Sequence, residues 1–374
     1  MESVSVQEES QLNEFSEIIA ENVDAVENSV NLELKQQEIK SFKQLLYLIA
    51  FTVMAVTGAQ KVLIFLIDTG IEHYIASLPT VPVEESAAVE YTPISDAAWN
   101  FLYFINWFLS HLIIFLPALI IFGLAFRKKL TFEKTGEPYE FKMSWILPVF
   151  LASYALSYIA SFISHLLAWV LQPVFGGDGL ADVFGDVMPR TGGQLIIMLV
   201  MVGLIGPVFE ELIYRHWLLR PLRRYGDFQA VIITALLFAF FHGNLTQFLY
   251  TFASGIIYGI VAVKTNSVKP VIILHIINNV YVILLAEFYR YTGELEELEG
   301  FAPTFLTLAF PWIIIGIGVF CFIYFLVRKY FKTENYNPHI PAAERVRIAA
   351  ENPLVLIMFA LLIAETIAGS RAGL

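Results

Sequence analysis

The chain has almost no cysteine and few positive charges, and both shortages exclude classes of protein. Cys321 is the only cysteine among 374 residues, so no disulfide can form within the chain, and we interpret this residue as a small buried hydrophobe. Lysine and arginine number 23 against 34 aspartate and glutamate residues, which gives a net charge of −11. Because nothing in the sequence is strongly basic, we expect no nucleic-acid partner.

The negative charge is concentrated near the start of the chain. Residues 1–40 contain ten acidic residues and two lysines, which account for −8 of the −11. This stretch lacks the basic start and apolar core of a signal peptide, so we expect it to stay in the mature protein. We interpret residues 1–42 as an acidic arm that is solvated and poorly ordered, although residues 30–42 could form a helix that runs into the first membrane span.

Long uncharged runs are abundant, in contrast to cysteine and basic residues. The chain is 57% hydrophobic with a mean hydropathy of +0.66, which predicts an all-α, polytopic membrane bundle, since a spanning helix needs about 20 apolar residues. Eight core spans are predicted at residues 45–67, 97–126, 144–172, 194–219, 228–242, 247–263, 271–289 and 304–327. A ninth segment, 353–368, is short and contains Glu365, so it could cross the membrane or lie in the interface.

The loops and one hairpin refine this topology. Loops rich in lysine and arginine all fall on one side of the predicted bundle, which places the N-terminus in the cytoplasm. Lys61 interrupts the first span and could either reach the interface or mark a broken or tilted helix. Residues 228–263 offer only 36 residues for two crossings, so this hairpin is expected to turn at Gly243 and stop short of the far surface. Gly255 and Gly259 should form a close helix-packing face.

Adjacent carboxylates within a predicted span give the strongest functional signal. The stretch PVFEELIYR at 207–215 carries Glu210, Glu211 and Arg215, and charge inside a membrane is costly, by roughly 2.5 to 3.5 kcal/mol per residue, and usually functional. Glu211 and Arg215 are four residues apart and can pair on one helical face. Glu210 points about 100° away from Glu211. We therefore assign chemistry to Glu210 and support to the Glu211–Arg215 pair, with a purely structural ion pair as the alternative.

Two further predicted helices contribute polar groups that suit amide hydrolysis. His242 ends an apolar helix, and His275 and Asn279 share one face of another. A desolvated carboxylate can take a proton from water with help from histidine. Histidine and asparagine can donate hydrogen bonds to an oxyanion. At about 1.5 Å per residue from the nearest cytoplasmic charge, Glu210 and Asn279 lie about 15 Å deep and His275 about 9 Å, whereas His242 lies about 22 Å deep.

Other chemistries compete with this interpretation. Glu210, His242 and His275 could bind zinc, although no His-Glu-x-x-His pair is present. Ser254 and His275 resemble the serine and histidine of rhomboid proteases, but Phe252 occupies the position where their motif has glycine. A membrane immunity or transport protein could use the same polar groups to bind a peptide or ion. His111 and His165 each follow a serine, and both are expected to bond within their own helices.

The three motifs together resemble a known family. Glu210-Glu211-x-x-x-Arg215, Phe238-x-x-x-His242 and His275-x-x-x-Asn279, in this order over residues 194–290, are similar to the CPBP intramembrane proteases, which include CAAX prenyl endopeptidases and relatives in bacteriocin processing and immunity. The resemblance implies an eight-helix core, a cavity open to the cytoplasm and metal-independent proteolysis without a cofactor. It assigns water activation to Glu210 with His242, and the oxyanion site to His275 with Asn279.

We therefore expect a glutamate-type intramembrane endopeptidase in a prokaryotic cell membrane. Its membrane bundle would span residues 43–335, with the motifs at 194–290, and residues 336–374 would form a C-terminal extension. The expected partners are the lipid bilayer and a peptide or membrane-tethered protein tail, which a prenyl group could anchor. The acidic arm and the outer loop at 68–96 lie outside the resemblance.

Overall fold

The computed structural model describes residues 2–77, 96–127, 142–175, 188–294, 309–332 and 339–372. All regular elements in these ranges are helices, which confirms the predicted all-α class. Most of the outer loop predicted at 68–96, and the first residues of the eighth predicted span, lie outside the described ranges. Seven helices are long and apolar enough to cross a membrane, and one bent pair could provide an eighth crossing. The chain is therefore an integral membrane protein.

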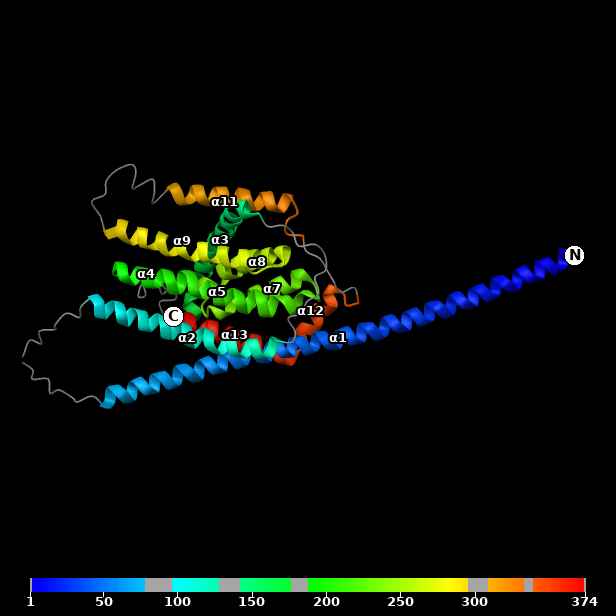
Figure 1. Cartoon of the computed structure of the whole chain (residues 1–374), viewed down its shortest axis with the longest axis horizontal. Helices are drawn as coiled ribbons and strands as arrows, with labels where there is room; N and C mark the ends of the chain where they lie inside the picture. The colour runs from blue at the N-terminus through cyan, green and yellow to red at the C-terminus, as the bar shows by residue number, and fades with distance from the viewer. Residues whose placement is uncertain are drawn as a thin grey trace, which may run out of the picture.

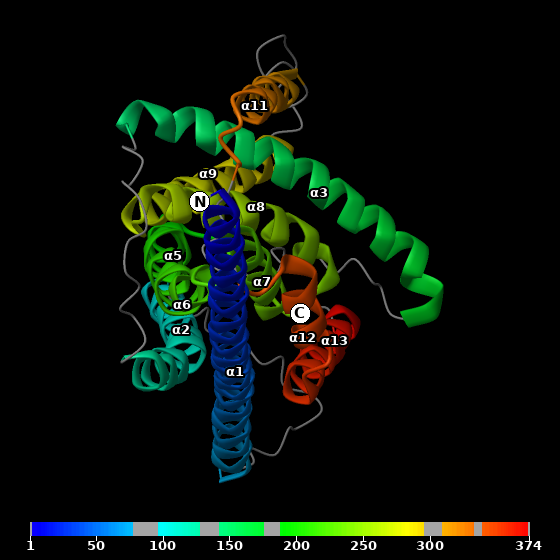
Figure 2. The same cartoon turned by 90° about the vertical axis from the view of Figure 1, so that its right-hand side faces the viewer.

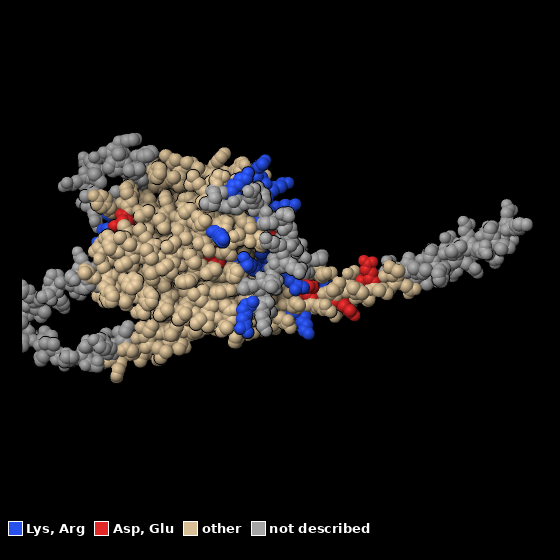
Figure 3. Space-filling model, in the orientation of Figure 1, with Lys and Arg blue, Asp and Glu red and all other residues tan. Residues whose placement is uncertain are grey.

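The long helices run broadly along one direction, and one of them crosses the rest (Figures 1 and 2). The crossing helix is α3 (Ile146–Phe175), which packs on both α8 (Leu245–Thr265) and α11 (Phe310–Val327). The others include α1 (Glu2–Ser77), α2 (Asp96–Phe126) and α9 (Lys269–Glu294). Lysine and arginine gather at the end of the bundle from which α1 projects (Figure 3).

Helix α1 begins in the acidic arm. The arm is helical from Glu2 and continues without a break into the first span, so residues 30–42 form a helix, as the alternative for this stretch predicted. The projecting part is visible in Figure 1. Two ion pairs hold the base of this projecting part against the bundle. Lys35 Nζ lies 2.9 Å from Glu344 Oε2, and Glu38 pairs with Arg224.

Lys61 and Glu365, which interrupt predicted apolar segments, form an ion pair with each other. Lys61 Nζ lies 3.1 Å from Glu365 Oε1, and this pair joins the unbroken α1 to α13 (Pro353–Ala372). A break in the first span is therefore excluded. Helices α12 (Ala342–Ala350) and α13 meet at a bend of 70°. Asn352 starts α13 at this bend, because its side-chain oxygen accepts hydrogen bonds from the backbone N–H groups of Leu354 and Val355.

In the hairpin of α7 (Asp227–Phe241) and α8, α7 has 15 residues, whereas α8 has 21 and is long and apolar enough to cross a membrane. Gly243 takes a positive φ of 69° at the turn, and the side chain of Asn244, which is buried, caps α8. A β-carbon on Gly255 would lie 3.1 Å from the Ala235 side chain, and one on Gly259 would lie 2.9 Å from the Val231 side chain. The predicted glycine packing face is therefore confirmed, and it brings α7 and α8 close together.

Two π-helical segments interrupt the apolar run of residues 192–223. The run consists of α4 (Gly192–Val200), the π-helical turn η3 (Met201–Ile205), α5 (Gly206–Glu211), the π-helical η4 (Leu212–Leu219) and α6 (Arg220–Arg223). Short π segments inside helices are rare and occur frequently at functional sites. Glu210 and Glu211 end the α-helical piece between the two π segments.

Candidate active site

Glu211, Arg215 and His275 form a buried charged group at the centre of the site. Arg215 Nε lies 3.1 Å from Glu211 Oε2, and neither side chain is exposed. The predicted pairing is therefore present. The other carboxylate oxygen of Glu211 lies 2.8 Å from Nδ1 of His275, a contact that the sequence did not predict. An ionised carboxylate only accepts hydrogen bonds, so His275 carries a proton on Nδ1 and turns Nε2 away from Glu211.

Glu210 faces the free side of the same imidazole. Its Oε2 lies 3.6 Å from His275 Nε2, and its side chain is 16% exposed whereas that of Glu211 is fully buried. The adjacent carboxylates thus contact opposite nitrogens of one ring. Helix geometry predicted that the Glu210 and Glu211 side chains point in different directions. As a result, only Glu210 lies where water or a substrate can reach it.

His242 joins this group through Phe238. Its Nδ1 lies 2.9 Å from the carbonyl oxygen of Phe238, so that nitrogen donates and Nε2 of the neutral ring keeps its lone pair. The Phe238 ring lies edge-on to both imidazoles, with centroids 4.9 Å from His242 and 5.9 Å from His275.

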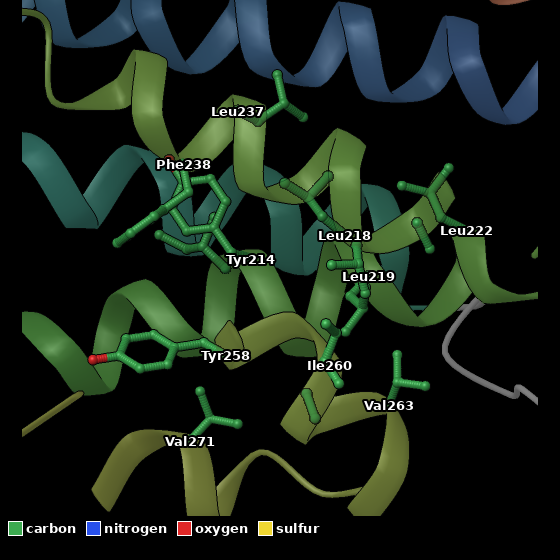
Figure 4. Packing of buried hydrophobic residues seen from close by; sticks show 14 of the residues in the cluster. Tyr214, Leu218, Leu219, Leu222, Leu237, Phe238, Tyr258, Ile260, Val263 and Val271 are labelled. Atoms are coloured by element: carbon green, nitrogen blue, oxygen red, sulfur yellow. The ribbon is translucent and has the colours of Figure 1, made fainter. Parts of the chain in front are cut away.

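Phe238 also closes the apolar side of the site. The Arg215 guanidinium carbon lies 4.8 Å from the Phe238 centroid, within the range of a cation–π interaction. Figure 4 shows Phe238 beside Tyr214, with Tyr258 below them, and the Tyr258 ring lies 5.3 Å from His275. These aromatic rings exclude water from the charged side chains.

An ion pair lies at the base of α7. Arg223 Nε donates to Asp227 Oδ1 over 2.8 Å, and both side chains are nearly buried. This contact fixes the start of α7 against α6, and the depth of His242 relative to Glu210 stays a prediction.

Asn279 contacts the helix that carries the carboxylates instead of the carboxylates themselves. Its Nδ2 donates to the carbonyl oxygen of Val202, in the π turn η3, over 3.0 Å. The Asn278 side chain donates in turn to Asn279 Oδ1 over 3.3 Å. Asn279 is therefore held beside the site by contacts on both sides, and it has a second N–H available.

The structure also places the residues named for the competing chemistries. Among the residues that the structure describes, no three His, Cys, Asp or Glu side chains are arranged to hold a metal ion. Ser254 is buried and donates to the carbonyl oxygen of Thr251 in its own helix over 3.0 Å, so its hydroxyl does not pair with His275.

Sequence reasoning missed two features of this site. The contact between Glu211 and His275 joins residues 64 positions apart, and no pattern within one helix predicts it. His111 bonds within its own helix as predicted, but it also contacts the π turn. A histidine within an uncharged span was the available signal.

The fold and these contacts define a polytopic membrane protein that encloses a group of carboxylates and imidazoles among its helices. Residues 192–281 match the family model described as type II CAAX prenyl endopeptidase Rce1-like. This segment is therefore an Rce1-like domain, which confirms the predicted resemblance to the CPBP family. Comparison with curated proteins and with solved structures gave no match. The family of the matched segment suggests a CAAX-type intramembrane protease.

Proposed function

We propose that the protein is an intramembrane endopeptidase that hydrolyses a peptide bond in a membrane-associated peptide or protein tail. The observation that carries this proposal is the position of Glu210: its carboxylate is 16% exposed and lies 3.6 Å from an imidazole whose other nitrogen is held by the buried Glu211. The match of residues 192–281 to an endopeptidase family supports the same conclusion.

Glu210 and His242 would activate water. The carboxylate accepts a proton from the water molecule as the water oxygen attacks the carbonyl carbon of the substrate. Because His242 Nδ1 bonds to the Phe238 carbonyl, its Nε2 lone pair is available to orient the same water. The proton accepted by Glu210 then passes to the departing amine, which balances the hydrolysis.

His275 and Asn279 would stabilise the oxyanion. Donation by His275 Nε2 requires a proton on that nitrogen as well as on Nδ1, which contacts Glu211. The second N–H of Asn279 adds a neutral donor. Arg215 and Glu211 support the site by neutralising each other and by orienting His275.

Reconstituted protein and two peptides test this proposal. The wild type should cleave a fluorogenic, farnesylated peptide with a C-terminal CAAX sequence in lipid vesicles, in excess chelator, while Glu210→Gln should not. The same peptide without the farnesyl group tests whether a membrane anchor is needed. Cleavage that survives Glu210→Gln would overturn the assignment of Glu210, and cleavage lost in chelator would favour a metal enzyme.

A comparison of cells that express the wild type with cells that express Glu210→Gln tests for substrates other than CAAX tails. New C-termini of membrane proteins should appear in cells that express the wild type and be absent with Glu210→Gln. If both forms leave the same C-termini while both still bind the peptide, the protein is a binding or transport protein.

A further inference from the structure

His111 connects α2 to the π turn beside the carboxylates. Its Nδ1 lies 2.8 Å from the carbonyl oxygen of Trp107 in the same helix, and its Nε2 lies 2.8 Å from the carbonyl oxygen of Met201 at the start of η3. Carbonyl oxygens only accept hydrogen bonds, so both ring nitrogens must carry protons for both contacts to be hydrogen bonds. The geometry therefore corresponds to a positively charged imidazolium.

The space between His111 and Glu210 is kept open by a glycine. A β-carbon on Gly206 would lie 3.6 Å from His111 Nε2 and 3.8 Å from Glu210 Oε1. The imidazole and the carboxylate thus border one small space that any side chain at position 206 would enter.

The π turn is also held on a second side. His111 contacts the carbonyl of Met201 from α2, and Asn279 contacts the carbonyl of the next residue, Val202, from α9. Two helices therefore bind consecutive carbonyls of the turn that precedes the carboxylates. Since η3 leads directly into α5, the position of this turn sets the position of Glu210.

We propose that His111 is a positioning residue of the site, which fixes η3 against α2 and places a positive charge beside Glu210. Its value for catalysis rests on the proposed function of Glu210. A positive charge at His111 would favour the oxyanion that develops during attack.

Nitrogen NMR of the full-length protein in nanodiscs tests the charge without any substrate. With ¹⁵N-labelled histidine and His111→Gln to assign the signals, both ring nitrogens of His111 should be protonated in the wild type. Their shifts should change in Glu210→Gln and stay unchanged in Glu365→Gln, which removes an intramembrane carboxylate elsewhere. A neutral single tautomer in the wild type, or shifts that ignore Glu210→Gln, would overturn the proposal.

Kinetics of cleavage test the positioning role. His111→Ala and His111→Gln should each lower kcat by about 10- to 100-fold with KM nearly unchanged, because a small displacement of a reacting group has an effect of this size. His111→Gln keeps one donor and should unfold like the wild type. His165→Ala is the matched control, since His165 is exposed and bonds to Ser161 within its own helix.

A kcat equal to that of the wild type in either His111 variant would count against the proposal. So would a loss of activity that is explained entirely by a smaller fraction of folded protein. If the wild type cleaves no peptide, the proposed function fails, and the NMR result alone then decides the charge of His111 and its link to Glu210.

Discussion

The region of residues 192–294 and the peripheral helices α1, α11 and α13 both contain charges and glycines inside apolar helices, but they enclose them differently. Glu211 and Arg215 are completely buried and share His275, whereas the Lys61 and Glu365 side chains are 66% and 30% exposed and contact each other. The apolar part of α8 is 61% buried and that of α11 only 22%. Intramembrane charge by itself therefore does not identify a site. A site is identified by the convergence of several helices on the charge.

Exchanging a glutamate for glutamine in each of the two regions should give the largest difference, and the quantity compared is kcat. Glu210→Gln removes the proposed proton acceptor and should lower kcat by about 10²- to 10⁴-fold, the usual contribution of a general base. Glu365→Gln should cleave like the wild type, because its carboxylate contacts only the peripheral Lys61. Assays on equal amounts of folded protein make the comparison. Equal losses in the two variants would remove the distinction between the regions.

Removing the basic partner should separate the two regions in stability. Arg215→Met removes the guanidinium partner of the buried Glu211 carboxylate and leaves it only the contact with His275, and breaking a buried ion pair costs about 3 to 5 kcal/mol. Lys61→Met should have a much smaller effect, because its side chain is largely exposed. Unfolding in mixed micelles measures both. Adding Glu211→Gln to Arg215→Met should recover part of the loss, and no recovery would contradict a buried unpaired charge.

Glycine substitutions compare the packing of the two regions. Gly259→Val would drive a side chain into Val231, 2.9 Å from the new β-carbon, and should cost about 1 to 3 kcal/mol as overpacking. Gly316→Val in α11 meets nothing within 4 Å and should be nearly neutral. Thermal unfolding of the detergent-solubilised variants distinguishes them. Equal destabilisation would mean that valine disturbs these helices for reasons other than contact.

The smallest effect is expected for coupling between Lys61 and Glu365. A double-mutant cycle with Lys61→Met and Glu365→Gln should give a coupling free energy of about 0.2 to 1 kcal/mol, as for other exposed pairs. A coupling as large as that of a buried pair would show that the bilayer encloses this contact more completely than the protein does.

The sequence was sufficient for features that depend on one helix. Apolar length predicts the spans, and four-residue spacing predicts the Glu211–Arg215 pair. It was insufficient where two helices meet. The partners of Lys61 and His275 lie 304 and 64 residues away along the chain, and no local periodicity encodes these distances.

The π segments were equally hidden, because apolar side chains in η3 and η4 satisfy the pattern of an α-helix. The acidic composition of the arm did not indicate that the first helix begins as early as Glu2, because the helix continues directly into the first span.

The π turn at Met201–Ile205 has a consequence for changes in chain length. Such a turn contains one residue more than the α-helical path, so deleting one residue there could restore regular pitch without breaking the helix. The helices on either side would keep nearly the same relative orientation, because the extra residue of a π turn is absorbed within the turn, but the backbone of the turn itself would repack. Every reactive side chain would survive in the sequence, yet the carbonyls that α2 and α9 bind would face other neighbours. Length at this point is therefore as much a part of the site as any functional group.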